Sequence, residues 1–116
     1  MSLNDQIRKE LESSSLEETH QRIKSLVDAT EHPKPLHLGI QLALGIASEL
    51  SQGKEPGAQT VATVAEWTKI HGTEIVDEAV MFARQFLLKP SELIRQIEGK
   101  LSADTKSEQE SEDSEP

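Results

Sequence analysis

The 116-residue sequence predicts an all-α fold, a small orthogonal bundle of five to six short helices around a central apolar helix, formed by residues 1–101. Three observations predict it. Apolar residues recur at helical spacing in segments separated by Pro, Gly and Ser. Only residues 36–50 also have the alternation of a strand. Residues 102–116 contain no large apolar side chain, and we expect them to form a disordered acidic tail.

Two short helices are expected before the first proline. In the first helix, apolar residues are spaced by four, as one helix face requires: Leu3, Ile7 and Leu11. The apolar stripe then moves to a different side, which predicts a break at residues 13–15. Ser15 and Glu18 fit a capping box, in which each side chain satisfies a free backbone N–H at the start of a second helix, residues 16–29. The prolines within residues 32–35 end that helix.

Residues 36–50, LHLGIQLALGIASEL, form the segment around which the rest of the domain is expected to pack. At about 100° per residue, its polar side chains and one glycine fall on a narrow stripe: His37, Gln41, Gly45, Ser48 and Gln52. The remaining circumference is apolar, so neighbouring helices must cover most of it. Small residues recur every four positions and would let another helix backbone approach closely: Gly39, Ala43 and Ala47.

The same segment also alternates like a strand, with Leu or Ile at every second position from Leu36 to Ile46. We favour a helix, because Leu and Ala are strong helix formers and no other stretch looks like a strand that could pair with this one. A membrane span is not predicted, because the apolar run is about five residues short of the ~20 that a bilayer requires.

A fourth helix is predicted over residues 58–71, after the turn residues 53–57, and a fifth over residues 73–88. Gly72 suits the left-handed position after the fourth helix, and Thr73 suits the cap of the fifth. The fourth helix presents its apolar residues on one side, with Trp67 near the edge: Val61, Val64, Ala65 and Thr68.

The fifth helix is the most clearly amphipathic segment of the chain. Its apolar arc is long: Ile75, Val76, Ala79, Val80, Phe82, Ala83, Phe86 and Leu87. Met81 and Leu88 lie instead among the polar residues, one above the other. Pro90 suits the first turn of a sixth helix. The apolar residues of that helix continue in one line: Leu93, Ile97 and Leu101.

Composition and charge argue against several classes of protein. The net charge of −9 argues against nucleic acids and anionic membranes as partners, because proteins bind both mainly through Lys and Arg. The absence of cysteine removes disulfides, thiolate catalysis and thiolate metal sites. The first residues lack the basic start and apolar run of a signal peptide, so we expect an intracellular, cytoplasmic protein.

Residues that could carry chemistry do not have the spacing that chemistry needs. His32 and His37 are close in sequence, but two prolines intervene and no carboxylate or third histidine stands at ligand spacing. His20 and His71 lie at or near helix ends and are expected to face solvent. The sequence contains no HExxH, P-loop, GxGxxG or GxSxG motif. We therefore predict no catalytic residue, no cofactor and no metal, and hence no enzyme.

Three residues are candidates for a partner-binding surface. Met81 and Leu88 either pack beneath the sixth helix or form an exposed apolar pair that a partner covers. Trp67 anchors either the core, which we favour, or an interface.

We expect a non-enzymatic protein-interaction module, self-associating or adaptor-type, that binds a protein partner or a second copy through apolar helix surface. A nearly apolar central helix is more surface than a few short helices easily cover, which favours a dimer. The alternative is a helix-turn-helix DNA-binding regulator that uses residues 58–71 and 73–88. Its would-be recognition helix opens with acidic residues that would face phosphates: Glu74, Asp77 and Glu78.

Overall fold

The chain is built from helices, with no strand in the part that the structure describes. A computed structural model describes residues 3–12, 15–55, 57–86 and 89–113, with side chains described over the same ranges except at 58, 59, 90, 91 and 105–113. The helices are α1 (Leu3–Glu10), α2 (Leu16–Asp28), α3 (Pro35–Ser51), α4 (Ala58–His71), α5 (Thr73–Gln85) and α6 (Pro90–Asp113). The all-α prediction is confirmed, and the strand alternative for residues 36–50 is wrong.

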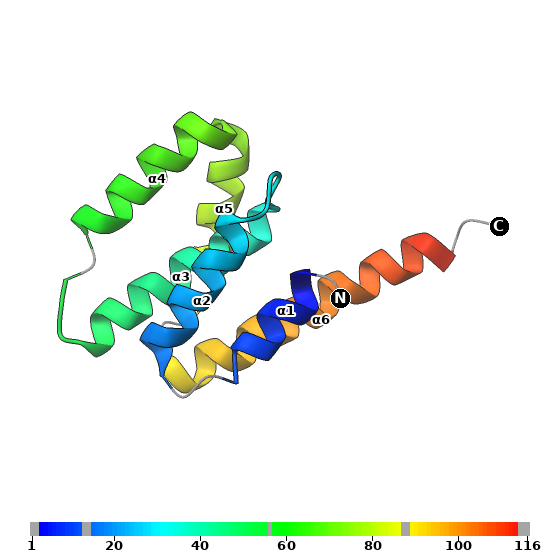
Figure 1. The fold of residues 1–116 in the computed structure, drawn as a ribbon, viewed down its shortest axis with the longest axis horizontal. Helices are drawn as coiled ribbons and strands as arrows, with labels where there is room; N and C mark the ends of the chain where they lie inside the picture. Colours follow the sequence, from blue (N-terminus) through cyan, green and yellow to red (C-terminus); the bar gives the residue numbers. More distant parts are fainter. Residues whose placement is uncertain (1–2, 13–14, 56, 87–88, 114–116) are drawn as a thin grey trace.

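Helix α3 is the centre of the bundle. Every residue from 36 to 44 is buried. The helix packs mainly against α5 and α2, and less extensively against α6 and α4 (Figure 1). Pro35 is the first residue of α3. The missing backbone N–H of proline costs no hydrogen bond at this position, because the first N–H groups of a helix have no acceptor within the helix. The polar stripe is buried too, at His37, Gln41 and Ser48, although the sequence predicts cover mainly for the apolar sides.

The close approach predicted from the small residues of α3 occurs at Gly39. A Cβ atom there would lie 2.8 Å from the carbonyl oxygen of Ala79 and 2.7 Å from the Cβ of Phe82. Both atoms belong to α5, so the two helices cross in near backbone contact. Ala43 and Ala47, one and two turns later, are also buried. The prediction that this face admits a neighbouring helix is confirmed.

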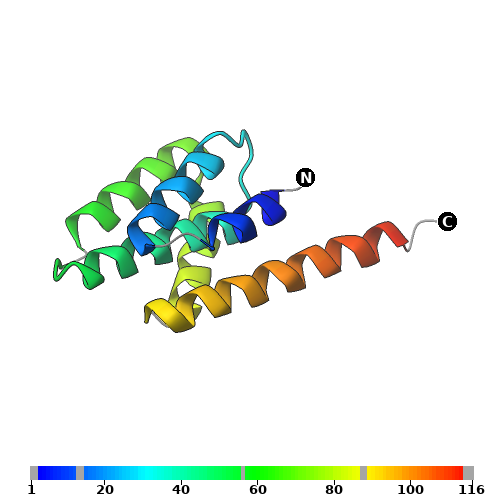
Figure 2. The same cartoon turned by 60° about the horizontal axis from the view of Figure 1, so that its bottom comes forward.

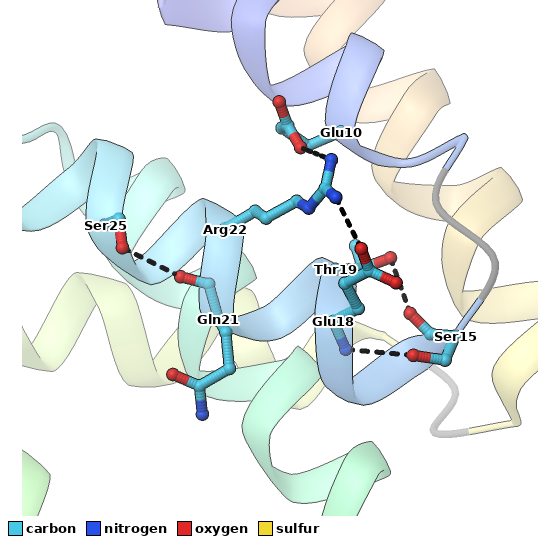
Figure 3. A network of polar contacts seen from close by, with 7 residues as sticks. All are labelled: Glu10, Ser15, Glu18, Thr19, Gln21, Arg22 and Ser25. Carbon is cyan, nitrogen blue, oxygen red and sulfur yellow. Dashed lines mark hydrogen bonds and ion pairs between the residues drawn. The ribbon is translucent and has the colours of Figure 1, made fainter.

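Helices α1 and α2 are joined by a short segment, and the predicted cap begins α2. The Ser15 hydroxyl accepts a hydrogen bond from the backbone N–H of Glu18 at 3.1 Å. Arg22 pairs with Glu18 and with Glu10 of α1 (Figure 3). Such exposed ion pairs contribute little, so α1 is held mainly by its buried apolar side chains, Ile7 and Leu11.

Helix α4 is rotated relative to the orientation that the sequence predicts. Val61 is 68% exposed and Ala65 is exposed, although both belong to the predicted apolar side. Trp67 is buried instead, with 6% of its surface exposed. An indole buries more apolar area than any other side chain of this helix, so the orientation that covers it prevails over the one that covers Val and Ala.

A single residue, Gly72, connects α4 and α5. Its φ of +93° is a conformation that residues with a Cβ rarely adopt, which accounts for glycine here. Gly72 is also the N-cap of α5, so the assignment of Thr73 as the cap is wrong: a one-residue connection places Thr73 inside the first turn. The predicted apolar arc of α5 is confirmed at its buried members, Val76, Ala79, Ala83 and Phe86.

Helix α6 packs on the bundle through the predicted apolar line. Its three members, Leu93, Ile97 and Leu101, are fully buried. Its helical bounds run on to Asp113, well into the predicted tail, and Figure 2 shows this part projecting beyond the other helices. Asp104 still contacts the bundle, so packed structure extends past the predicted boundary at residue 101. The side chains of residues 105–113 and the whole of residues 114–116 lie outside the described part of the chain. The prediction that the tail is disordered falls mostly on these residues.

Candidate functional site

A cleft of about 550 Å³ opens between α2, α3 and α4. Helix α3 forms its floor, α2 and α4 form its walls, and the segment between α2 and α3 closes one end. The cleft exists because α4 packs mainly on α5 and only slightly on α3, so it stands apart from α2 (Figure 1). Its volume lies within the range of about 300–1,000 Å³ that is usual for binding pockets.

The floor of the cleft consists of two parallel rows along α3. Residues four apart lie above one another on a helix, so the lining residues of α3 divide into an apolar and a polar row. The apolar row is Leu38, Leu42 and Ile46. The polar row is Gln41, Gly45 and Glu49. Val27 of α2 and Trp67 of α4 add buried apolar surface to the walls. An occupant would therefore meet apolar and polar surface side by side.

His20 of α2 lies over Gly45. A Cβ atom on Gly45 would be 3.0 Å from Nε2 of His20, so the imidazole fills the space that a larger residue would need. His20 is half-buried, and the expectation that it faces solvent is wrong. Burial lowers the pKa of His20, and the Lys24 charge adds to this, against the opposing effect of Glu49. The ring is therefore neutral at pH 7.

Gln41 contributes a buried acceptor to the cleft. Its side chain is 4% exposed, and Oε1 has no hydrogen-bond partner among the described atoms. Leaving such a group unpaired costs about 1–3 kcal/mol. Because Gln41 lines the cleft, a donor on a bound molecule can supply the missing hydrogen bond.

The charged side chains that line the cleft are mostly acidic. Four carboxylates contribute to the lining, from Asp28, Glu31, Glu49 and Glu66, against one ammonium from Lys24. The cleft therefore attracts cations and repels anions at neutral pH.

A second polar cluster ties α1, α3 and α6 together, away from the cleft. His37, 3% exposed, is 2.5 Å from Oδ1 of the buried Asn4, and Nδ2 of Asn4 donates to Asp104 at 2.8 Å. Since Oδ1 of Asn4 can only accept, Nε2 of His37 carries the proton. Burial, with Lys34 adding and Asp104 opposing, lowers the pKa of His37 to about 4. The cluster therefore links helices α1, α3 and α6 through hydrogen bonds.

The structure separates the three residues predicted from the sequence as partner contacts. Trp67 is part of the core, as favoured, and also lines the cleft. Met81 is 60% exposed on α5, outside the cleft, and Leu88 lies outside the described residues. Sequence reasoning missed Glu49 and Ile70, and placed Gln41 on a polar stripe without a role. The available signal was that Gln41 and Glu49 are eight residues apart, about two helical turns, and so lie on the same face of the helix.

No helix in the described part of the chain combines the length and apolar character needed to cross a bilayer. Within the same part, no three His, Asp or Glu side chains gather in an arrangement that could hold a metal ion. Comparison with protein-family models, with curated proteins and with solved structures finds no match to this chain. The cleft is thus the feature from which a function is inferred.

Proposed function

We propose that this chain is a non-enzymatic, adaptor-type interaction module, which binds an amphipathic helix of a partner protein in the cleft between α2, α3 and α4. The observation that carries the proposal is the cleft itself, with the apolar row of the central helix at its floor and Ile70, 63% exposed, at its edge. A groove between helices is filled well by another helix, whose apolar side chains enter it while its polar face stays in water.

Charge supports a partner protein over a second copy of this chain. The net charge is −9, and carboxylates predominate among the charged residues around the cleft. A second copy would bring like charges together, which costs free energy on association. We therefore infer a heterologous partner, met in an intracellular setting, with which the cysteine-free sequence is compatible.

The helix-turn-helix alternative has less support. In α5, which would read the DNA, Glu74, Asp77 and Glu78 are all exposed. Carboxylates on that face would be repelled by phosphates, whereas DNA-binding helices usually present Lys, Arg and amide side chains. The exposed surface of α5 therefore favours the interaction module over the DNA binder.

The proposal is tested by titrating the protein with a helical peptide of Leu and Gln in amphipathic order and following the fluorescence of Trp67, the single tryptophan. Ile70→Gln and Met81→Gln are matched variants, because the two side chains are 63% and 60% exposed and only Ile70 lines the cleft. We expect Ile70→Gln to weaken binding about tenfold through lost apolar contact, and Met81→Gln to leave it unchanged.

Two results would count against the proposal. One is a Trp67 signal that stays unchanged at all concentrations of every amphipathic helical peptide tested, and the other is equal loss of affinity in the two variants, which would place the contact elsewhere. Light scattering over a dilution series gives a further check, because a mass that rises with concentration would favour self-association.

A further inference from the structure

We infer that the helix bound in the cleft is basic, and that one of its lysine or arginine side chains donates a hydrogen bond to Gln41. This inference rests on the proposed function, because it specifies the chemistry of the partner helix.

The first support is the unpaired acceptor of Gln41. More than about 90% of buried polar groups in proteins have a hydrogen-bond partner, so a buried Oε1 without one calls for an explanation. Gln41 lines the cleft, where a bound molecule can reach it. An acceptor selects for a donor, and lysine and arginine side chains carry donors only.

The second support is the charge around Gln41. Glu49 stands two turns further along the same polar row, and the other lining carboxylates are Asp28, Glu31 and Glu66. Lys24 is the one lysine or arginine among the described lining residues, and the neutral His20 adds no positive charge. A cationic side chain placed along this row is attracted by its surroundings, whereas a carboxylate is repelled.

The spacing of the polar row specifies the partner further. Gln41 and Glu49 are eight residues apart, which is about 12 Å along the helix axis. Basic residues seven or eight apart on a helix lying along α3 have nearly the same separation, about 10–12 Å. A row of Lys or Arg at this spacing beside an apolar stripe would match the polar row and the apolar row together.

The test uses two helical peptides with the same leucine pattern, one with lysine and one with glutamate at the polar positions. Binding to the full chain is followed by Trp67 fluorescence, and we expect the lysine peptide to bind at least about tenfold more tightly. In the variant Gln41→Met, which keeps the length and removes the acceptor, the lysine peptide should lose about tenfold in affinity. Removing an unpaired buried acceptor should not impair folding.

A matched pair of charge variants separates the cleft from the overall acidity. Glu49→Gln and Glu78→Gln make the same change in net charge, but only Glu49 lines the cleft. We expect Glu49→Gln to weaken binding of the lysine peptide several-fold and Glu78→Gln to have less than about a twofold effect.

Equal affinity for the two peptides would overturn the inference, as would equal loss in Glu49→Gln and Glu78→Gln. The neutral peptide of Leu and Gln distinguishes the two levels of proposal. If it binds as well as both charged peptides, the inference about basic residues fails and the interaction module stands. If no peptide changes the Trp67 signal, the proposed function itself fails.

Discussion

Replacing Gly39 by alanine should destabilise the chain, although alanine is the better helix former. The new Cβ would meet the Ala79 carbonyl oxygen at 2.8 Å, whereas ordinary contact begins at 3.4 Å. To restore ordinary contact between the new Cβ and this oxygen, α3 and α5 must separate by about 0.6 Å along their main contact. Neither the carbonyl nor the Phe82 Cβ can rotate away, so overpacking should cost about 3 kcal/mol.

The gain in helix propensity from glycine to alanine is about 1 kcal/mol, which leaves a net loss of about 2 kcal/mol. Gly99 provides the control, because it lies in helix α6 with nothing within 4 Å of an added Cβ. Gly99→Ala should therefore raise the free energy of unfolding by about 0.5–1 kcal/mol.

Urea unfolding followed by far-UV circular dichroism measures both changes on one scale. If Gly39→Ala proved as stable as the parent chain, or as stabilising as Gly99→Ala, the close crossing of α3 and α5 would be refuted.

The polar cluster and the end of the domain give further predictions, each measured by urea unfolding. The pKa of His37 falls from 6.5 to about 4 on folding, so on acidification the unfolded chain takes up the proton before the folded chain does. The free energy of unfolding should therefore be at its highest above pH 6.5 and fall by up to about 3 kcal/mol towards pH 4. His37→Gln should flatten this dependence, and an unchanged slope would exclude His37 as its source. Asn4→Ala removes hydrogen bonds to His37 and Asp104 and should lower the free energy of unfolding by about 1–3 kcal/mol. An unchanged urea midpoint would mean that these hydrogen bonds do not stabilise the fold. Truncation after Ser102 removes Asp104 and should lower the free energy of unfolding by about 1 kcal/mol, whereas truncation after Lys106 keeps Asp104 and should leave it unchanged. Equal stability of the two truncated chains would place the end of the packed domain at residue 101.

Helix positions could be predicted from the sequence because the signals for them are local. Apolar residues at helical spacing mark each buried face, and a hydroxyl at Ser15, prolines at 33 and 35 and a glycine at 72 mark ends. The role of Gly39 also follows from spacing, since small residues recur every four positions on α3. These features depend on neighbours within a few residues of one another.

The cleft could not be predicted, because it depends on how α4 is rotated. The sequence of α4 offers two competing faces, one with Val61 and Ala65 and one with Trp67, and only the packing of the whole bundle decides between them. The burial of His37 is similar, since its partner Asn4 is 33 residues away in the chain. Long-range contacts of this kind leave no periodic signal in one sequence.

The most direct measurement of the binding cleft is a map of amide and indole chemical shifts in the ¹⁵N-labelled chain during titration with the lysine peptide. We expect the largest shifts at the Gly45 amide, the Gln41 side-chain amide and the Trp67 indole, and we expect these shifts to saturate together. Largest shifts around Met81 or along α6, or small changes spread over the acidic surface without saturation, would contradict this expectation.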